Sequence, residues 1–305
     1  MTRRRVPLRL AHIWPTFKAG LKGWWDDNVP RLGASLAYYT LFAIAPVLLV
    51  AIAIAGRAFG DEAVRGELVG QVQQLIGVEG GRAVQALLAG ASNRASGVIA
   101  TIIGSVTFVL AATGAFLELQ TALNTIWRVK PKSSANIRDF LVERLISFGI
   151  VVALGFLLTV SLAVSAGLAA TSAWLNARMP GMPLVWEALN VIVSLGVMSL
   201  MFALLYKVLP DVELEWRDVW VGAIMTAVLF AIGKTLIGLY LGRSSTASAY
   251  GAAGSVVVLL LWVYYSAQIV LLGAELTRAY TASHGPKPPP ESFATPDPNA
   301  VAKNT

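Results

Sequence analysis

The sequence has no cysteine among its 305 residues and only two histidines, His12 and His284, both near its ends. The absence of cysteine excludes disulfides, thiolate metal sites, iron–sulfur clusters and cysteine nucleophiles. The sequence also lacks an H-x-H, an H-E-x-x-H and a paired-aspartate motif, which metal-assisted hydrolysis would need. We therefore expect no metal, no cofactor, no catalytic residue and no enzymatic activity.

Charge is the second scarcity. Only 13% of the residues are charged, whereas 56% are hydrophobic and the mean hydropathy is +0.66. Soluble domains carry about 25% charged residues, so this chain cannot cover a soluble surface. The net charge of +7 favours contact with anionic lipid over binding of nucleic acid. The composition predicts a protein embedded in the bilayer.

What the sequence does have is long stretches free of charge, the first of them over 32–56 between Arg31 and Arg57. About 20 helical residues cross a bilayer core. Only helices can cross singly, because lipid offers the backbone no hydrogen-bond partner. We therefore predict an all-α membrane protein with six transmembrane helices, at about 32–56, 96–118, 145–172, 186–207, 219–242 and 251–275.

The lysines and arginines predict the orientation. With the N-terminus inside, 17 of the 24 fall on the cytoplasmic side and 6 on the opposite side. Cytoplasmic loops carry the excess of basic residues. We expect both termini to be cytoplasmic, and we expect no cleaved signal peptide, since no apolar run follows the N-terminal arginines.

Three segments are not expected to span. Residues 1–30 form a cytoplasmic segment whose part at 10–25 has the spacing of an amphipathic helix, either lying in the interface or packed on the bundle. Residues 61–95 predict an external amphipathic helical hairpin broken at the "GVEGG" of 77–81, either a lid or a cap. Residues 281–305 are rich in proline and polar residues and predict a disordered tail, which leaves 31–280 as the transmembrane domain.

Four stretches resemble a known family. They are "GASLAYYTLFAIAPVLL" in the first span, "ALNTIWRVKP" at 122–131, "LYKVLPDVELEWRDVWVGA" at 205–223 and "YGAAGSVVVLLLWVYYSAQIVLLGAEL" at 250–276. Together, and in this order, they are similar to the YihY/virulence factor BrkB family, once described as ribonuclease BN. The resemblance implies a bacterial inner-membrane protein with six helices and a role in the envelope, including ion or lipid transport. The ribonuclease description has no chemical support in these residues.

Polar residues within the spans are the candidates for function, because an ionisable group inside a membrane is costly. Lys234 lies in the fifth predicted helix and either faces a cavity or extends to the outer interface. Gln268 and Asn124 either bind a substrate or join neighbouring helices. Pro46 predicts a bend in the first span.

A set of charged residues is expected at the cytoplasmic mouth, as an ion-pair cluster that is either structural or a gate: Glu118, Arg138, Arg144, Glu275 and Arg278. Two functions stay open. The chain is either transporter-like, moving an ion or an anionic lipid-like substrate, or a non-transporting envelope scaffold. The expected partner is the bilayer, with anionic lipids on the cytoplasmic face, and a homo-oligomer is left open.

Overall fold

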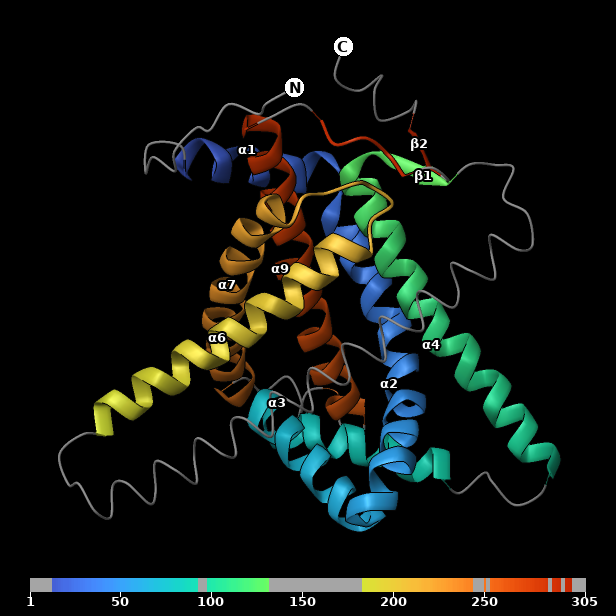
Figure 1. Cartoon of the computed structure of the whole chain (residues 1–305). Helices are drawn as coiled ribbons and strands as arrows, with labels where there is room; N and C mark the ends of the chain where they lie inside the picture. The colour runs from blue at the N-terminus through green and yellow to red at the C-terminus, as the bar shows by residue number, and fades with distance from the viewer. Residues whose placement is uncertain are drawn as a thin grey trace. The chain divides into compact units, whose positions relative to one another are not determined.

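The computed structural model describes residues 13–92, 98–131, 183–243, 250, 253–284, 287–291 and 294–297. These residues are almost entirely helical (Figure 1). They form two compact units. Unit 1 comprises 1–27, 123–231 and 272–305, and unit 2 comprises 28–122 and 232–271. The helices are α1 (Ile13–Asp26), α2 (Val29–Phe59), α3 (Asp61–Ser92), α4 (Val98–Trp127), α6 (Pro183–Val208), α7 (Trp216–Arg243) and α9 (Gly254–His284).

Three helices begin and end close to the predicted bounds. The predictions 32–56, 186–207 and 219–242 correspond to α2, α6 and α7, and each bound agrees within three residues. Helix α2 is helical on both sides of Pro46, and the bend there stays a prediction. The helix predicted at 145–172 lies outside the described residues.

Two helices are longer than predicted. Helix α4 ends at Trp127 rather than at residue 118, and α9 ends at His284 rather than at residue 275. The predicted ends were set at the first charged residue after each apolar run, Glu118 and Glu275. A helix can continue past a charge when other groups compensate it, and the partners of Glu275 do so, as described below.

The core of unit 1 is built where α6, α7 and α9 approach closely. Tyr206 on α6 is fully buried, and its hydroxyl lies 3.0 Å from that of Thr226 on α7. Gly273 on α9 faces both residues, and a Cβ there would lie less than 3 Å from the Tyr206 hydroxyl. Thr226 and Thr277 donate their hydroxyls to carbonyls one turn back in their own helices. These threonines are therefore satisfied locally, which suits an apolar environment.

The C-terminal segment of unit 1 differs from the predicted disordered tail in the residues described. Strand β2 (Ala294–Pro296) pairs antiparallel with β1 (Val129–Pro131), as Figure 1 shows. The N–H of Glu213 donates to Pro289 (3.0 Å), and the N–H of Glu291 donates to Asp211 (3.1 Å). Composition predicted disorder because the tail has no core of its own, but its backbone pairs with edges that other segments supply.

Unit 2 is organised around α2 and α3. Gly60 connects the two helices and has a φ of 87°, a backbone conformation that favours glycine. The helical geometry of α3 is interrupted at Gly77 (φ 79°), the first residue of "GVEGG". Both halves of α3 contribute to one core, which contains Ala37, Ile52, Ala83, Val84, Leu88, Leu259 and Val263, with Val64, Leu68 and Val72 packed against it. Whether α3 is external stays a prediction.

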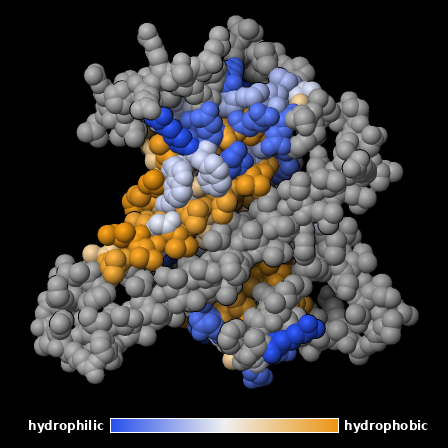
Figure 2. Space-filling view, viewed as in Figure 1, coloured by the Kyte–Doolittle hydropathy of each residue, from blue (hydrophilic) through white to orange (hydrophobic). Residues whose placement is uncertain are grey.

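Within the described ranges, four helices are long and apolar enough to cross a membrane, over Val29–Leu49, Val191–Val208, Trp216–Tyr240 and Gly254–Ser283. Their surfaces agree with this. In unit 1, Figure 2 shows hydrophobic residues gathered in a band along α6. Val191 and Ile192 on α6 and Ile224 and Val228 on α7 are among the exposed apolar side chains. The predicted spans at 96–118 and 145–172 stay predictions.

Candidate functional site

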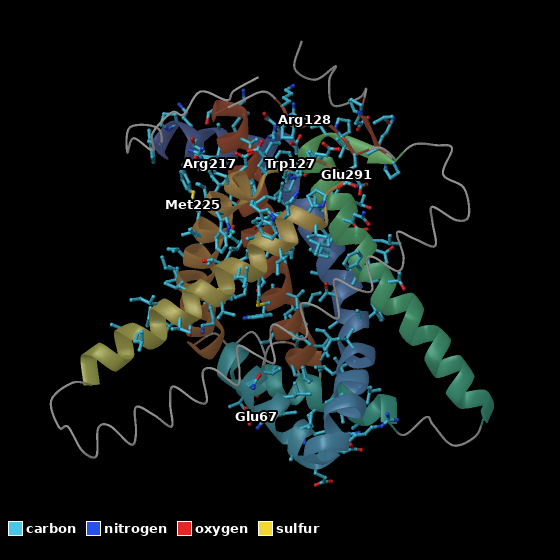
Figure 3. All side chains as sticks on the ribbon, in the orientation of Figure 1. Glu67, Trp127, Arg128, Arg217, Met225 and Glu291 are labelled. Atoms are coloured by element: carbon cyan, nitrogen blue, oxygen red, sulfur yellow. The ribbon has the colours of Figure 1, made fainter. Side chains whose placement is uncertain are left out.

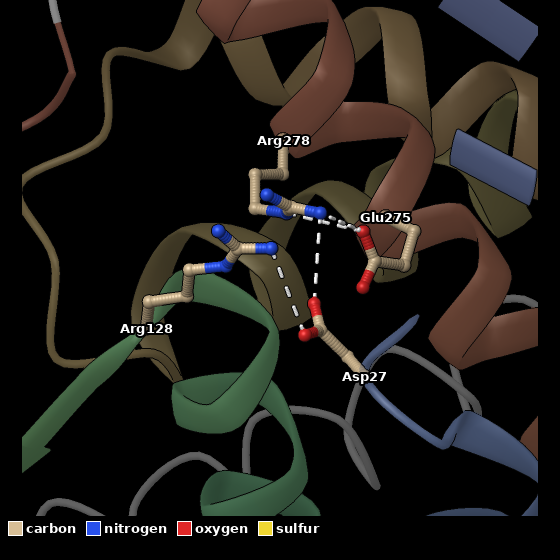
Figure 4. A network of polar contacts seen from close by, with 4 residues as sticks. All are labelled: Asp27, Arg128, Glu275 and Arg278. Carbon is tan, nitrogen blue, oxygen red and sulfur yellow. Dashed lines mark hydrogen bonds and ion pairs between the residues drawn. The ribbon is translucent and has the colours of Figure 1, made fainter. Parts of the chain in front are cut away.

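Four charged side chains meet in unit 1 (Figure 4). We call Asp27, Arg128, Glu275 and Arg278 the charge network. The Arg278 guanidinium donates to Glu275 Oε2 from Nη2 (2.7 Å) and Nε (3.1 Å). The same Nη2 lies 3.6 Å from Asp27 Oδ2, and Arg128 Nη2 lies 3.7 Å from Asp27 Oδ1. Two guanidinium groups therefore face the two oxygens of one carboxylate.

The charge network is largely removed from water. The Glu275 side chain is 0% exposed, and the side chains of Asp27, Arg128 and Arg278 are 12%, 20% and 22% exposed. Charges placed in a low-dielectric environment must be compensated by partners, and removal of one partner leaves the other at a high cost. The network thus places two basic beside two acidic side chains, so that each buried group has a partner of the opposite type.

Local backbone geometry positions two members of the network. Asp27 follows α1 directly, and its N–H donates to the Gly23 carbonyl (2.8 Å). Arg128 follows α4 in the left-handed conformation (φ 60°), which costs a non-glycine residue about 1–2 kcal/mol. Its N–H donates to Thr125 (3.1 Å), and its carbonyl accepts from Asp297 (2.9 Å). The surrounding bonds thus hold Arg128 in a conformation that it would not adopt alone.

A glycine makes room for the network. A Cβ at Gly23 would clash with Glu275 Oε2 and would lie 2.6 Å from Arg278 Nη2. Only glycine therefore allows α1 to lie this close to the charged pair of α9. This constraint connects the sequence of α1 to the burial of Glu275.

Several polar atoms at the network lack a hydrogen-bond partner among the described residues. They are Glu275 Oε1, Asp27 Oδ2, Arg128 Nε and the indole nitrogen of Trp127. Figure 3 shows Trp127 and Arg128 together at the end of α4. Buried polar atoms without a partner are rare, and each one calls for an explanation. Here they provide two acceptors and two donors for a further group.

Asn124, a predicted binding residue, is engaged within unit 1. Its Nδ2 donates to Asp211 Oδ2 (2.7 Å), and its Oδ1 accepts the Asp211 backbone N–H (2.9 Å). Both residues are buried. The amide joins α4 to the loop after α6, which is the interhelical role considered for it.

Carboxyl groups crowd the same loop. Glu291 has a pKa above its ordinary value because it is partly buried and because the carboxylates of Asp211 and Glu213 face it, while Lys207 opposes the effect. No group of three or more His, Asp or Glu side chains in the described ranges is placed to hold a metal ion.

The remaining candidates lie elsewhere. Lys234 is exposed on α7. Gln268 lies in unit 2, where its Nε2 is 3.5 Å from the Pro30 carbonyl and its buried Oε1 has no partner among the described residues. Of the predicted ion-pair cluster, Glu275 and Arg278 meet in the network. Glu118 belongs to unit 2 and is not a member of the charge network, while Arg138 and Arg144 lie outside the described residues.

Sequence reasoning missed Asp27 and Arg128. Arg128 lies in the "ALNTIWRVKP" stretch, so a signal was present, although it did not indicate a partner. Asp27 is separated from Arg278 by most of the chain, and nothing local to its own sequence distinguishes it from Asp26. Only the packing of α1 on α9 brings it to the arginines.

The motifs around this network now have a context in known proteins. The model of the family Virulence factor BrkB matches residues 21–296. This chain belongs to the Virulence factor BrkB family. The match begins within α1 and ends in β2, so it includes all four residues of the charge network.

Curated relatives agree with this membership. A UPF0761 membrane protein of Ralstonia nicotianae is 31% identical over 254 residues, which cover 82% of this chain and 55% of the relative. A UPF0761 membrane protein of Verminephrobacter eiseniae is 32% identical over 264 residues, covering 84% and 60%. The chain thus spans somewhat more than half the length of these relatives. No solved structure matches it.

Proposed function

We propose that this BrkB-family membrane protein is transporter-like, resides in the bacterial inner membrane with both termini in the cytoplasm, and moves an ion or an anionic lipid-like molecule of the envelope. The observation that carries the proposal is the charge network. A buried ion pair is often no more stabilising than well-packed apolar residues of the same volume. Four such groups at the end of an apolar helix therefore point to a use other than stability.

The geometry indicates what the network would bind. Arg128 and Arg278 approach the two oxygens of Asp27 at 3.7 and 3.6 Å. These pairs are long compared with the 2.7 Å bond between Arg278 and Glu275. A phosphate or carboxylate presents the same acceptor oxygens as Asp27, and guanidinium groups bind such groups strongly. An anionic group would displace Asp27 from the two arginines, while Glu275 retains Arg278.

Liposome reconstitution tests this function. Flux of monovalent cations and of labelled anionic phospholipid is measured for the wild type, Arg128→Gln and Lys234→Ala, with Arg82→Gln as a control that removes an exposed guanidinium on α3. We expect flux in the wild type and the control, and at least a tenfold loss in Arg128→Gln. A loss of flux in Lys234→Ala would place Lys234 on the transport path. Unchanged flux in that variant would assign the transport path to the charge network. Wild-type flux no higher than that of empty liposomes, for both substrate classes, would overturn the proposal.

The second candidate is a non-transporting envelope scaffold. It is favoured by the exposure of Lys234 on α7 and by the way Asp27 joins the ends of α1 and α4 to α9 through ion pairs. In that case the network only holds helix ends together. The scaffold predicts that Arg128→Gln lowers stability in detergent without any wild-type flux to lose.

A further inference from the structure

Helix α1 has an unusual distribution of side chains. Its buried residues are Thr16, Gly20 and Gly23. Steps of four and three residues place them on one face of the helix. All three are small. The large apolar side chains of a water-facing helix would normally lie on the buried face, so α1 is inverted relative to a helix of a soluble domain.

The opposite face is exposed and largely apolar. We call Trp14, Lys18, Leu21, Lys22 and Trp25 the outward face of α1. Trp14 and Trp25 are 72% and 73% exposed, and Leu21 is also exposed. Lys18 and Lys22 are exposed between the two tryptophans, and Asp26 follows at the helix end. Exposure of two indole rings to water is unfavourable, because the free energy falls when apolar surface leaves water.

The contacts of the buried face show at which residues of α9 helix α1 packs. A Cβ at Gly20 would meet Leu276, and one at Gly23 would meet Glu275 and Arg278. The candidate span of α9 ends at Ser283. Leu276 therefore lies about 10 Å before that end, at 1.5 Å per residue. Figure 1 shows α1 crossing α9 near its C-terminal end. This is the depth at which amphipathic helices settle, at the boundary of headgroups and acyl chains.

We propose that the outward face of α1 docks on the membrane surface and binds anionic phospholipid headgroups there. Tryptophan favours this boundary because its ring is apolar and its N–H is polar. Lys18 and Lys22 face the same side as the indoles, and their charge complements a phosphate-bearing surface. A protein partner would instead cover the face and shield it from lipid. The proposal does not depend on transport.

The absence of cysteine makes the test direct, because an introduced cysteine is the only site for a thiol-reactive spin label. Leu21→Cys places the label on the outward face and keeps both tryptophans, and Lys287→Cys provides an exposed reference position on the C-terminal segment. Collision with oxygen and with a water-soluble nickel chelate is measured in vesicles of neutral phosphatidylcholine and in vesicles with 30% phosphatidylglycerol. We expect position 21 to collide with oxygen and to be protected from nickel, and position 287 to collide with nickel.

The lysines give the second arm. In the Leu21→Cys background, Lys18→Gln/Lys22→Gln is compared with Lys130→Gln/Lys287→Gln, which removes two exposed lysines from other elements of unit 1. Spin-labelled phosphatidylglycerol is expected to associate with the protein more than spin-labelled phosphatidylcholine, and the first pair is expected to lower that preference roughly fivefold per lysine. The control pair is expected to leave it unchanged.

Three results would overturn the proposal. Nickel access at position 21 equal to that at position 287 would show that the face is in water. Protection of position 21 from both reagents would show that protein covers it. Lipid contact without any headgroup preference, or a preference that survives removal of Lys18 and Lys22, would reject anionic recognition.

Discussion

Two glutamate–arginine pairs in this chain have the same spacing and nearly the same length, and they differ in their surroundings. Glu79 and Arg82 on α3 approach to 2.6 Å, with side chains 38% and 65% exposed. Glu275 and Arg278 on α9 approach to 2.7 Å, with side chains 0% and 22% exposed. Both are E-x-x-R, so the local pattern alone does not separate them. What separates them is the protein around them.

The difference in burial changes what each pair does. In water the pair on α3 gains little, because the solvent screens the charges and the side chains lose freedom when they are held together. In α9 the same contact compensates two charges that the core would otherwise exclude. It also allows α9 to continue nine residues beyond Glu275. The exposed pair contributes little to the stability of α3. The buried pair is required for the packing of α1 and the end of α4 against α9.

The largest expected effect comes from Glu275→Gln compared with Glu79→Gln. Breaking the buried pair leaves Arg278 without its closest partner and is expected to lower the free energy of unfolding by about 3–5 kcal/mol. Breaking the exposed pair is expected to cost less than about 1 kcal/mol. Reversible unfolding in mixed micelles measures both. Equal losses in the two variants would contradict the comparison.

Asn124→Ala extends the comparison to a second buried contact. It leaves the buried Asp211 without the 2.7 Å bond from Nδ2, and hydrogen bonds to charged groups contribute about 1.5–3 kcal/mol. We expect a loss of that size in the same unfolding assay, with Gln71→Ala as a control because Gln71 donates to Glu67 at the surface (2.9 Å). A loss no greater than that of the control would show that Asn124 does not support Asp211.

Gly23→Ala tests the space around the buried pair without removing a charge. The added methyl would meet Glu275 and Arg278, and overpacking of this kind costs about 1–3 kcal/mol. Gly66→Ala on α3 is the matched control, because nothing lies within 4 Å of its Cβ position. It is expected to stabilise the helix by about 0.5–1 kcal/mol. The two substitutions should thus have opposite signs, and a stabilising Gly23→Ala would refute the close contact of α1 with the pair.

The smallest effect concerns pH. The raised pKa of Glu291 means that its folded state binds a proton more readily than the unfolded chain. Its contribution is fully present below the unfolded pKa of about 4.3 and is lost as pH rises through the folded pKa. Glu291→Gln should therefore be more stable than the wild type at pH 8, and this gain should disappear at pH 4. Figure 3 labels Glu291.

Lys207→Gln sharpens this measurement, because Lys207 lowers the pKa of Glu291. Its removal should move the pH-dependent loss of stability toward higher pH. If the pH profiles of the wild type and Glu291→Gln were parallel, the crowding of carboxylates around Glu291 would be refuted.

Apolar patterning predicted much of the fold. The bounds of α2, α6 and α7 agree within three residues because a span is defined by its own residues, namely a charge-free stretch of sufficient length. The same criterion placed the ends of α4 and α9 too early, at Glu118 and Glu275. It assumes that a charged residue cannot lie in a buried part of a helix. The tail was predicted to be disordered for a similar reason, since its pairing partners Val129–Pro131 and Asp211–Glu213 lie far away in sequence.

The candidate site divides in the same way. Glu275 and Arg278 were predicted as two members of a five-residue ion-pair cluster, and in the structure these two pair with each other on α9. Asp27 and Arg128 were not predicted, because they reach the pair only where the ends of α1 and α4 pack against α9. The stretch containing Arg128 resembles a family motif, but a motif does not specify which carboxylate an arginine will face.

By itself, the sequence determined that this chain is an apolar helical protein of the BrkB type and where most of its helices lie, because hydrophobicity and helix length act along the chain. Only the tertiary structure decided which of two equivalent Glu–Arg pairs is buried, that Asp27 and Arg128 complete the charge network, and that the tryptophans of α1 face outward. These outcomes depend on distance through space, on the removal of water and on whether a glycine leaves room for a neighbour. The local sequence around each residue does not determine these factors.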